Sequence, residues 1–449
     1  MPRPKVDPAR EQALQILHRT ETSLSFPKLL IEYSVERAVS TERDKALTYQ
    51  LVIGTLRHRG TLDWALRKLC KTPLEDLTPW IRNILRMGLY QILFLDRIPK
   101  SAAVDESVKL AKRYGHAGTA GLVNAVLRNA KRDQLLHSIQ SLGEDAIPDI
   151  AAKYSHPEWL AELLLNDWGK EKAIETMKHN NAIPPLTARV NTLRATRDAL
   201  LQEFETEGIQ ARPLPHTDET IELISVSAPW KLDAHKRGLF YLQDPSSMLA
   251  AHCLAAQPGE KVLDVCAGPG GKATHSAALM NNAGEIYALD VYDHRIKLIE
   301  ENARRLGATI IETHKQDATA DLKSRYGEMD RVVADVPCSG LGVIRRRVDL
   351  KWRLRPEQID ELVRLQSAIL DSAAECVRRG GILLYCTCTV TRRENSEMVK
   401  DFLHHHPEFT IDASPPKQLE KYLSEEGSVQ IMPGDDDMDG FFIARLRRL

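Results

Sequence analysis

The chain has 449 residues, of which 43% are hydrophobic and 27% charged, with a formal net charge of −1. This length suits two or three domains, and the composition excludes a disordered or fibrous protein. The N-terminus lacks an apolar signal-peptide core and no stretch approaches the roughly 18 apolar residues of a membrane span, so we expect a cytoplasmic protein with no membrane partner. The seven cysteines follow no disulfide-scaffold spacing. In a reducing cytosol they are available for catalysis or packing.

The charge is distributed unevenly along the chain. Residues 1–140 hold 23 Lys/Arg against 14 Asp/Glu, a net of +9, whereas the remainder holds 38 against 48, a net of −10. A basic N-terminal third favours a polyanionic partner such as nucleic acid, although a solvated helical surface gives the same pattern.

The first two regions differ in their expected secondary structure. Residues 1–140 predict an all-α bundle, because a capping box at Thr41–Asp44 precedes apolar residues at helical spacing and prolines fall between the periodic segments. Residues 141–240 mix a helix opening at Pro157 with the strand-like NNAIPPLTARVN and the helix-like TRDALLQEFETEG. They predict an α+β connector, the N-terminal part of the module that follows.

Residues 241–449 alternate short apolar strands with helices. The strands are KVLDVCA, EIYALD, TIIETHKQD, RVVADVPC and GILLYCTCTV, followed at the end of the chain by GFFIARLRRL. This alternation predicts a parallel sheet with helices on both faces, and the last strand has no following helix and is expected to pair antiparallel.

The first of these strands leads into a glycine-rich turn. Its pattern, D-x-x-x-G-x-G from Asp264 to Gly270, is that of the S-adenosylmethionine pocket of Rossmann-like methyltransferases, and it matches neither a dinucleotide fingerprint nor a phosphate loop. Asp290, Asp317 and Asp335 end the next three strands, so four acids are expected at one edge of the sheet. We expect Asp290 to accept the ribose hydroxyls and Asp317 the adenine amine; capping of the next helix is the alternative for each acid.

Two cysteines are expected beside that pocket, each directly after a strand. Cys338 and Cys388 lie 50 residues apart in ADVPCSG and YCTCTV. The C5 carbon of cytosine is a poor nucleophile, so its methylation requires a thiolate that first adds to C6, and a base must later remove the C5 proton. Asp335 is placed to hydrogen-bond the base during this addition.

Packing is the alternative role for a cysteine, and we expect it for Cys386, Cys376, Cys253 and Cys70. A metal site from the C-x-C pair and the histidines at 404–406 is not expected, because alternate residues of a strand face opposite ways. We therefore predict no metal.

Several motifs together resemble a known family. DVCAGPGGKATH, ADVPCSGLG, YCTCTV followed by Glu394-Asn395, and PGDDDMDGFFIARL resemble the RNA 5-methylcytosine methyltransferases over about residues 240–449. ILRMGLYQILFLDRIPKSAAVDESVKLAK and GLVNAVLRN resemble the NusB-like RNA-binding domain. The pairing is similar to the bacterial small-subunit ribosomal RNA methyltransferases of the Fmu/Sun family.

This resemblance implies a multidomain fold with an N-terminal all-α NusB-like bundle (1–140), the α+β connector (141–240) and a C-terminal α/β Rossmann-like class I methyltransferase domain (241–449). It implies that Cys388 is the nucleophile and that Cys338 assists release, whereas DNA cytosine methyltransferases reverse these roles. The cofactor is S-adenosyl-L-methionine. Its implied contacts are Cys266, Ala267, Gly268, Pro269, Gly270, Gly271, Lys272, Asp290, Asp317 and Asp335. Many relatives carry alanine where this chain has Gly268, and we expect the glycine to be tolerated there.

The implied substrate is a cytosine of 16S ribosomal RNA, unstacked into the pocket either from naked RNA or from a small-subunit assembly intermediate. The basic run GVIRRRVDLKWR follows Cys338 and is expected to hold phosphates, with a basic surface loop as the alternative. The residues expected to contact RNA are Arg345, Arg346, Arg347, Lys351, Arg128 and Lys131. Alternatives are methylation of another RNA such as tRNA, a DNA methyltransferase, and a non-enzymatic RNA-binding or antitermination factor. We expect a monomer.

Overall fold

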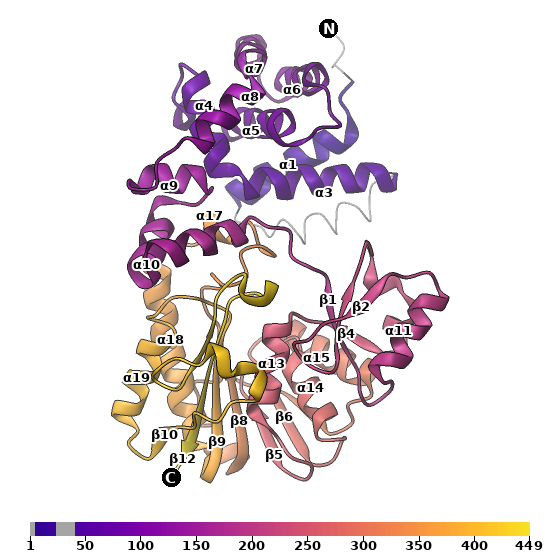
Figure 1. Ribbon diagram of the computed structural model, residues 1–449, viewed down its shortest axis with the longest axis vertical. Coiled ribbons are helices and arrows are strands. Elements are labelled where there is room, and N and C mark those ends of the chain that lie inside the picture. The colour runs from indigo at the N-terminus through magenta and orange to yellow at the C-terminus, as the bar shows by residue number, and fades with distance from the viewer. Residues whose placement is uncertain (1–4, 24–40) are drawn as a thin grey trace. The chain divides into compact units, whose positions relative to one another are not determined.

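The computed structural model describes residues 5–23 and 41–449, which divide into two compact units (Figure 1). Unit 1 comprises Met1–Ala182 and Ile344–Leu354, and unit 2 comprises Ile183–Val343 and Arg355–Leu449. Among the described residues, no helix combines the length and the apolarity needed to cross a membrane.

Unit 1 is helical, as its sequence predicts. The predicted capping box is confirmed: the Thr41 hydroxyl accepts from the backbone N–H of Asp44, and the Asp44 carboxylate accepts from the N–H of Thr41. Helix α5 (Pro79–Phe94) is central, with nearly all its residues from Ile81 to Leu93 buried. The other helices are α1 (Pro8–Thr22), α3 (Glu42–Arg57), α4 (Arg59–Leu69), α6 (Lys100–Tyr114), α7 (Ala117–Asn129), α8 (Arg132–Gln140), α9 (Ile147–Lys153), α10 (Glu158–Asn180) and the short α17 (Leu350–Arg353). Helices α9 and α10, placed by the sequence analysis in the connector, cluster with unit 1.

The segment Ile344–Leu354 is an integral part of unit 1, although it comes from the middle of the catalytic sequence. The Lys351 side chain is fully buried, and its ammonium donates to the carbonyl of Arg57 at 3.1 Å and to Asn181 Oδ1 at 2.8 Å. The indole N–H of Trp352 donates to the carbonyl of Leu56 at 2.7 Å. The segment therefore packs into the bundle and is held there by hydrogen bonds to Leu56, Arg57 and Asn181.

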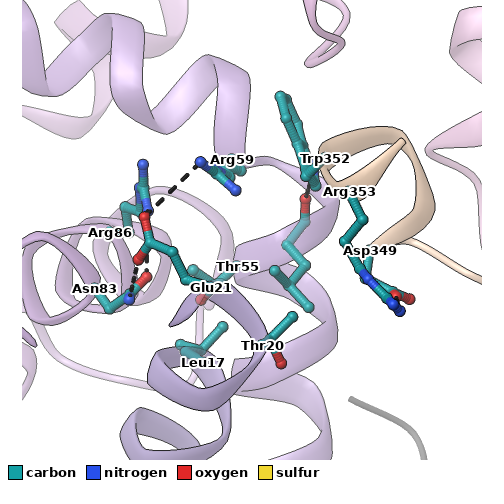
Figure 2. Close-up of a pocket in the computed structure, with 11 residues that line it drawn as sticks. Leu17, Thr20, Glu21, Thr55, Arg59, Asn83, Arg86, Asp349, Trp352 and Arg353 are labelled. Atoms are coloured by element: carbon teal, nitrogen blue, oxygen red, sulfur yellow. Dashed lines mark hydrogen bonds and ion pairs between the residues drawn. The ribbon is translucent and has the colours of Figure 1, made fainter. Parts of the chain in front are cut away.

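A buried ionic cluster lies beside this segment and lines a cavity of about 110 Å³ (Figure 2). Glu21 accepts from Arg82 at 2.8 Å, from Arg86 at 3.3 Å and from the Asn83 amide at 2.6 Å. Burial would raise the pKa of Glu21, but the guanidinium groups around it, led by Arg86, outweigh burial and lower that pKa. The cluster compensates charges that the helices bury, as interior ion pairs must.

Unit 2 begins with a small antiparallel sheet in the order β2-β3-β1-β4. Helix α11 (Arg197–Thr206) packs against this sheet, and the short α12 (Asp233–Lys236) lies between β3 and β4 in the chain. Its strands are β1 (Thr187–Val190), β2 (Ala211–Pro213), β3 (Thr220–Leu223) and β4 (Phe240–Leu242). Phe204 and Phe240 meet edge to face in its core. This is the predicted α+β connector.

The main sheet of unit 2 has the order β10-β12-β9-β8-β5-β6-β7 (Figure 1). The five strands β9, β8, β5, β6 and β7 pair parallel, whereas β12 pairs antiparallel with β9, as predicted for the last strand. The strands are β5 (Lys261–Asp264), β6 (Glu285–Asp290), β7 (Ile311–Lys315), β8 (Met329–Asp335), β9 (Val377–Thr387), β10 (Phe409–Ile411), β12 (Phe441–Arg448) and β11 (Val429–Ile431), which also pairs with β12.

Helices cover both faces of this sheet because its strands are apolar on both sides. Val262 of β5 belongs to one apolar cluster and its neighbour Leu263 to another, as the alternation of strand side chains requires. The first cluster includes residues of α13 (Pro245–Leu254), α14 (Gly271–Leu279) and α15 (Asp293–Leu306), and the second includes residues of α18 (Pro356–Glu375) and α19 (Ser396–His405). The predicted Rossmann-like architecture is confirmed, and the carboxyl ends of the parallel strands meet at one edge.

Candidate active site

The two predicted thiols lie together at that edge. Cys388 directly follows β9, Cys338 follows β8 by three residues, and their sulfur atoms are 3.3 Å apart. The hydrogen bond with Cys388, together with burial, raises the pKa of Cys338 well above its usual value. Either sulfur atom can donate in this hydrogen bond, so the two thiols titrate as a pair.

A buried carboxylate holds the two cysteine loops in place. Glu394 has no exposed surface and accepts from the backbone N–H of Ser339 at 2.8 Å and from the Ser339 hydroxyl at 2.5 Å. It also accepts from the hydroxyl of Thr391 at 2.8 Å, beyond Cys388 in the chain. Ser339 follows Cys338 directly, so this one side chain joins the loops that carry both thiols. The sequence analysis quoted Glu394 within a motif but gave it no role.

Gln366 of α18 completes this support. Its amide donates to Glu394 Oε1 at 3.0 Å and to the carbonyl of Pro337 at 2.9 Å. On the other loop, the Asn395 amide donates to the carbonyl of Thr389 at 3.1 Å. The backbone on both sides of the thiol pair is thus fixed by buried side chains, which is the condition for a pre-organised site.

The glycine-rich turn between β5 and α14 forms the predicted cofactor loop. Gly270 has a φ of 99°, a left-handed conformation that favours glycine, and it immediately precedes the first turn of α14. Asp264 at the end of β5 is 2% exposed, and burial, followed by the nearby Asp335, raises its pKa to about 7. The loop therefore presents backbone N–H groups at a helix N-terminus, with a buried acid behind it.

Lys272 and Asp335 form an ion pair between this loop and the end of β8. The Lys272 ammonium lies 2.6 Å from Asp335 Oδ2. Burial would lower the pKa of Lys272, but the Asp335 carboxylate outweighs burial and raises that pKa above its usual value. Asp335 ends β8, the strand that leads to Cys338, and Lys272 follows the glycine-rich turn. The ion pair therefore links the thiol site to the predicted cofactor site.

Asp290 and Asp317 also lie at the strand ends, with different exposure. Asp290 ends β6, is 3% exposed, and accepts from the N–H of Tyr292 at 3.0 Å. Asp317 lies two residues beyond the end of β7 and is exposed, and its carboxylate accepts from the N–H of Thr319 at 2.9 Å. Each acid thus closes a local turn while leaving further acceptor capacity for a ligand.

In this arrangement of side chains, position 268 has no room for the methyl group of an alanine. A Cβ atom there would lie 2.5 Å from Asp290 Oδ2 and 2.8 Å from Arg295 Cδ. Both side chains would have to move, because real Cβ atoms do not approach other atoms so closely. The missing methyl group at Gly268 leaves room for the Asp290 carboxylate.

Arg189 is a supporting residue that the sequence analysis missed. It lies on β1 of the connector, is 2% exposed, and donates to the carbonyl of Gly271 at 2.7 Å and to the Thr274 hydroxyl at 3.1 Å. It therefore fixes the first turn of α14 from the connector side. No local motif marks it; an arginine within an otherwise apolar strand is the only sign.

The structure corrects two of the predicted RNA contacts. Lys351 and Arg345 are 0% and 1% exposed, so they are not available to hold phosphates and do not form the alternative, a basic surface loop. The ammonium of Lys351 is satisfied by groups of the bundle, as described above. Arg347, Arg128 and Lys131 are exposed and Arg346 is half-buried, so these four stay predictions. Cys386, Cys253 and Cys376 are buried among apolar residues, and Cys70 is half-buried.

Comparison with known proteins assigns the chain to a family. A family model described as 16S rRNA methyltransferase RsmB/F matches residues 251–447, NusB family matches 7–132, and a RsmF/B-like ferredoxin-like domain matches 156–228. The probable ribosomal RNA small subunit methyltransferase B of Bacillus subtilis (strain 168) is 36% identical over 443 residues, covering 98% of both chains. The chain belongs to the ribosomal RNA small subunit methyltransferase B family.

Solved structures agree with this family assignment. The crystal structure of PH0851 superposes with a TM-score of 0.81 at 26% identity, covering 99% of this chain and all of that one. NSun6 from Pyrococcus horikoshii, solved with SFG, has a TM-score of 0.59 at 24% identity, covering 65% of this chain and 98% of that one, and so shares the fold. The members of the family are RNA methyltransferases, which makes this chain an enzyme with a ribosomal RNA substrate and explains its NusB-like helical unit.

Proposed function

We propose that the chain transfers a methyl group from S-adenosylmethionine to C5 of a specific cytosine in 16S ribosomal RNA, through a covalent bond between Cys388 and C6 of the base. The observation that carries this proposal is the pair of sulfur atoms 3.3 Å apart, at the strand ends beside a glycine-rich cofactor loop. A ribosomal substrate places the activity in the cytoplasm, on naked RNA or on an assembling small subunit.

The residues of the loop and the strand ends suit S-adenosylmethionine. The turn from Cys266 to Lys272 offers backbone N–H groups, Asp290 can accept ribose hydroxyls, and the exposed Asp317 can accept the adenine amine. A neighbour of the same fold was solved with SFG, an analogue of this cofactor. When bound, the cofactor supplies an electrophilic methyl group.

The thiols then perform the covalent chemistry. The Cys388 thiolate adds to C6, which forms a C–S bond and makes C5 a nucleophile able to take the methyl group. A base next removes the C5 proton, and the electron pair of that C–H bond restores the C5–C6 double bond as the C–S bond breaks. Cys388 leaves as a thiolate. Cys338 assists this release, because its sulfur lies beside the bond that must break.

Asp335 has a role at the boundary between the two subsites. Its carboxylate is paired with Lys272 at 2.6 Å yet keeps part of its surface exposed, so an oxygen is available to hydrogen-bond the N3/N4 edge of cytosine. We assign it to positioning the base as Cys388 adds.

The first prediction is methyl transfer itself. Tritium from methyl-labelled S-adenosylmethionine should appear in deproteinised 16S ribosomal RNA at one cytosine, which bisulfite sequencing of a deletion strain would locate. If the methyl group is transferred to tRNA or DNA instead, the proposed ribosomal RNA substrate is wrong. An absence of transfer to both naked RNA and immature small subunits, with cofactor binding intact, would favour a non-enzymatic RNA-binding factor.

A second prediction concerns the basic surface of unit 1. If the exposed Arg128 and Lys131 neutralise phosphates, changing both to glutamine should lower the slope of log affinity against log salt by about 2, roughly one per contact. Deleting the bundle is a poor test, because the segment 344–354 would lose its hydrogen-bond partners. Lys68→Gln, on the exposed side of α4, is the matched control. An unchanged slope in the double variant would move phosphate binding away from these residues.

A further inference from the structure

Three side chains that the proposed function does not use converge in unit 2. Glu219 directly precedes β3 of the connector, His252 lies on α13, and His275 lies on α14, one turn beyond Lys272. Glu219 Oε1 is 2.6 Å from His252 Nε2 and 2.9 Å from His275 Nε2. All three potential ligand atoms lie within 4.8 Å of one another.

The environment of His275 is unusual for a hydrogen-bonded histidine. Its side chain is 2% exposed, and neither ring nitrogen has an aligned hydrogen-bond partner within residues 5–23 and 41–449. Its Nε2 is close to Glu219 but does not point at the oxygen as a hydrogen bond requires. Buried polar atoms are rarely left unpaired in folded proteins. A cation between the two imidazoles and the carboxylate would satisfy this nitrogen.

Arg189 lies near enough to His275 to interact with it electrostatically. The positive charge of Arg189 opposes a cation, but its guanidinium is held by Gln243, Gly271 and Thr274.

The donor set also selects the kind of ion. Two imidazoles and one carboxylate are characteristic of zinc, with ligand bonds of about 2.0–2.2 Å and hence ligand atoms about 3.3 Å apart in a tetrahedron. The distances from Glu219 Oε1 to the two imidazole nitrogens, 2.6 and 2.9 Å, are shorter than that spacing, so the side chains would move slightly apart to admit the ion. The His252 side chain is 28% exposed, so a water molecule can supply the fourth ligand.

We propose that Glu219, His252 and His275 bind one Zn²⁺ ion, a site not expected from the sequence. The ion would tie the connector to α13 and α14, which pack against each other (Figure 1). Because α14 begins at Gly271, the ion would hold the helix that carries the cofactor loop. Its role is to position that helix, and it takes no part in methyl transfer.

Metal binding by the full chain tests this inference without any measurement of methyl transfer. Protein stripped with a chelator should take up one Zn²⁺ per chain by calorimetry, and Co²⁺ should give the intense absorption bands of a tetrahedral site. His252→Ala and Glu219→Gln should weaken the affinity at least about tenfold. His404→Ala, a change of an exposed histidine elsewhere in the unit, is the matched control and should bind as the wild type does.

Stability of the unaltered chain provides a second measurement in case a variant fails to fold. Zn²⁺ should raise the melting temperature of the wild type and a chelator should reverse the rise, whereas Mg²⁺ should have no effect. The inference is overturned if the wild type binds no stoichiometric Zn²⁺ or Co²⁺. It is equally overturned if His252→Ala and Glu219→Gln bind as tightly as His404→Ala.

Discussion

Replacing Cys388 with alanine should abolish methylation, by a factor on the order of 10⁴ or more, and should leave no covalent protein–RNA complex. The reason is that, in the proposed mechanism, C5 becomes a nucleophile only after the Cys388 thiolate has added to C6. Cys338→Ala should give the opposite picture: a complex that survives denaturation and accumulates, because methyl transfer proceeds but release of the C–S bond is slow. Denaturing gels with labelled RNA, with and without cofactor, measure both.

The two variants together decide which thiol attacks. Their sulfur atoms are 3.3 Å apart, so either could reach the base, and distance alone does not separate the roles. The raised pKa of Cys338 does not separate them either, because its main cause is the hydrogen bond that the two sulfur atoms share. Cys70→Ser, in unit 1, is the matched control and should behave as wild type. If the complex accumulates in Cys388→Ala instead, Cys338 is the nucleophile, as in the DNA cytosine methyltransferases.

Replacing Glu394 with glutamine should lower kcat by roughly 10- to 100-fold while leaving cofactor affinity unchanged. Glutamine has nearly the same shape but keeps one acceptor oxygen, so it cannot accept both the bond from the Ser339 N–H at Oε1 and the bonds from the Ser339 and Thr391 hydroxyls at Oε2. A buried donor or acceptor left unsatisfied costs about 1–3 kcal/mol, so the thermal stability of the variant should fall as well.

The comparison that isolates the role of Glu394 is Glu397→Gln, an exposed change three residues later in the first turn of α19. It removes the same charge without touching the cysteine loops and should leave both kcat and stability near wild type. The rate at which Glu394→Gln forms the covalent protein–RNA complex should also be measured, because a loss of stability alone does not change that rate. Wild-type adduct kinetics in this variant would mean that Glu394 supports only the fold.

The sheet and its functional edge could be predicted because their signals are local. Three parallel strands, β5, β6 and β8, end in an acid, and Cys388 directly follows β9; parallel strands bring those ends to one edge. Asp264, Asp290 and Asp335 follow this rule directly. The glycine-rich turn is equally local, because its backbone conformation limits which residues can form it.

The supporting residues were beyond prediction because their partners are distant in sequence. Glu394 acts on Ser339, 55 residues earlier, and Arg189 acts on Gly271, 82 residues later. The sequence predicts an RNA contact at Lys351 because the residue is basic. It does not reveal that the ammonium is buried and bonded to the Arg57 carbonyl. Glu219, His252 and His275 share no motif spacing, since they come from three separate elements.

Unit 1 is built from two separate parts of the chain, and this determines the order in which its parts can fold during synthesis. The ribosome completes α10 and then adds about 170 residues between Ala182 and Leu354 before the segment that fills the bundle exists. At about 5–20 residues per second this interval lasts roughly 10–30 s. Throughout it, the carbonyl of Leu56 lacks the bond from Trp352, and the carbonyl of Arg57 has the bond from the Ser155 hydroxyl but not that from Lys351. The NusB-like unit is therefore the first to begin folding, yet it is finished only after the strand that leads to Cys338 has been made.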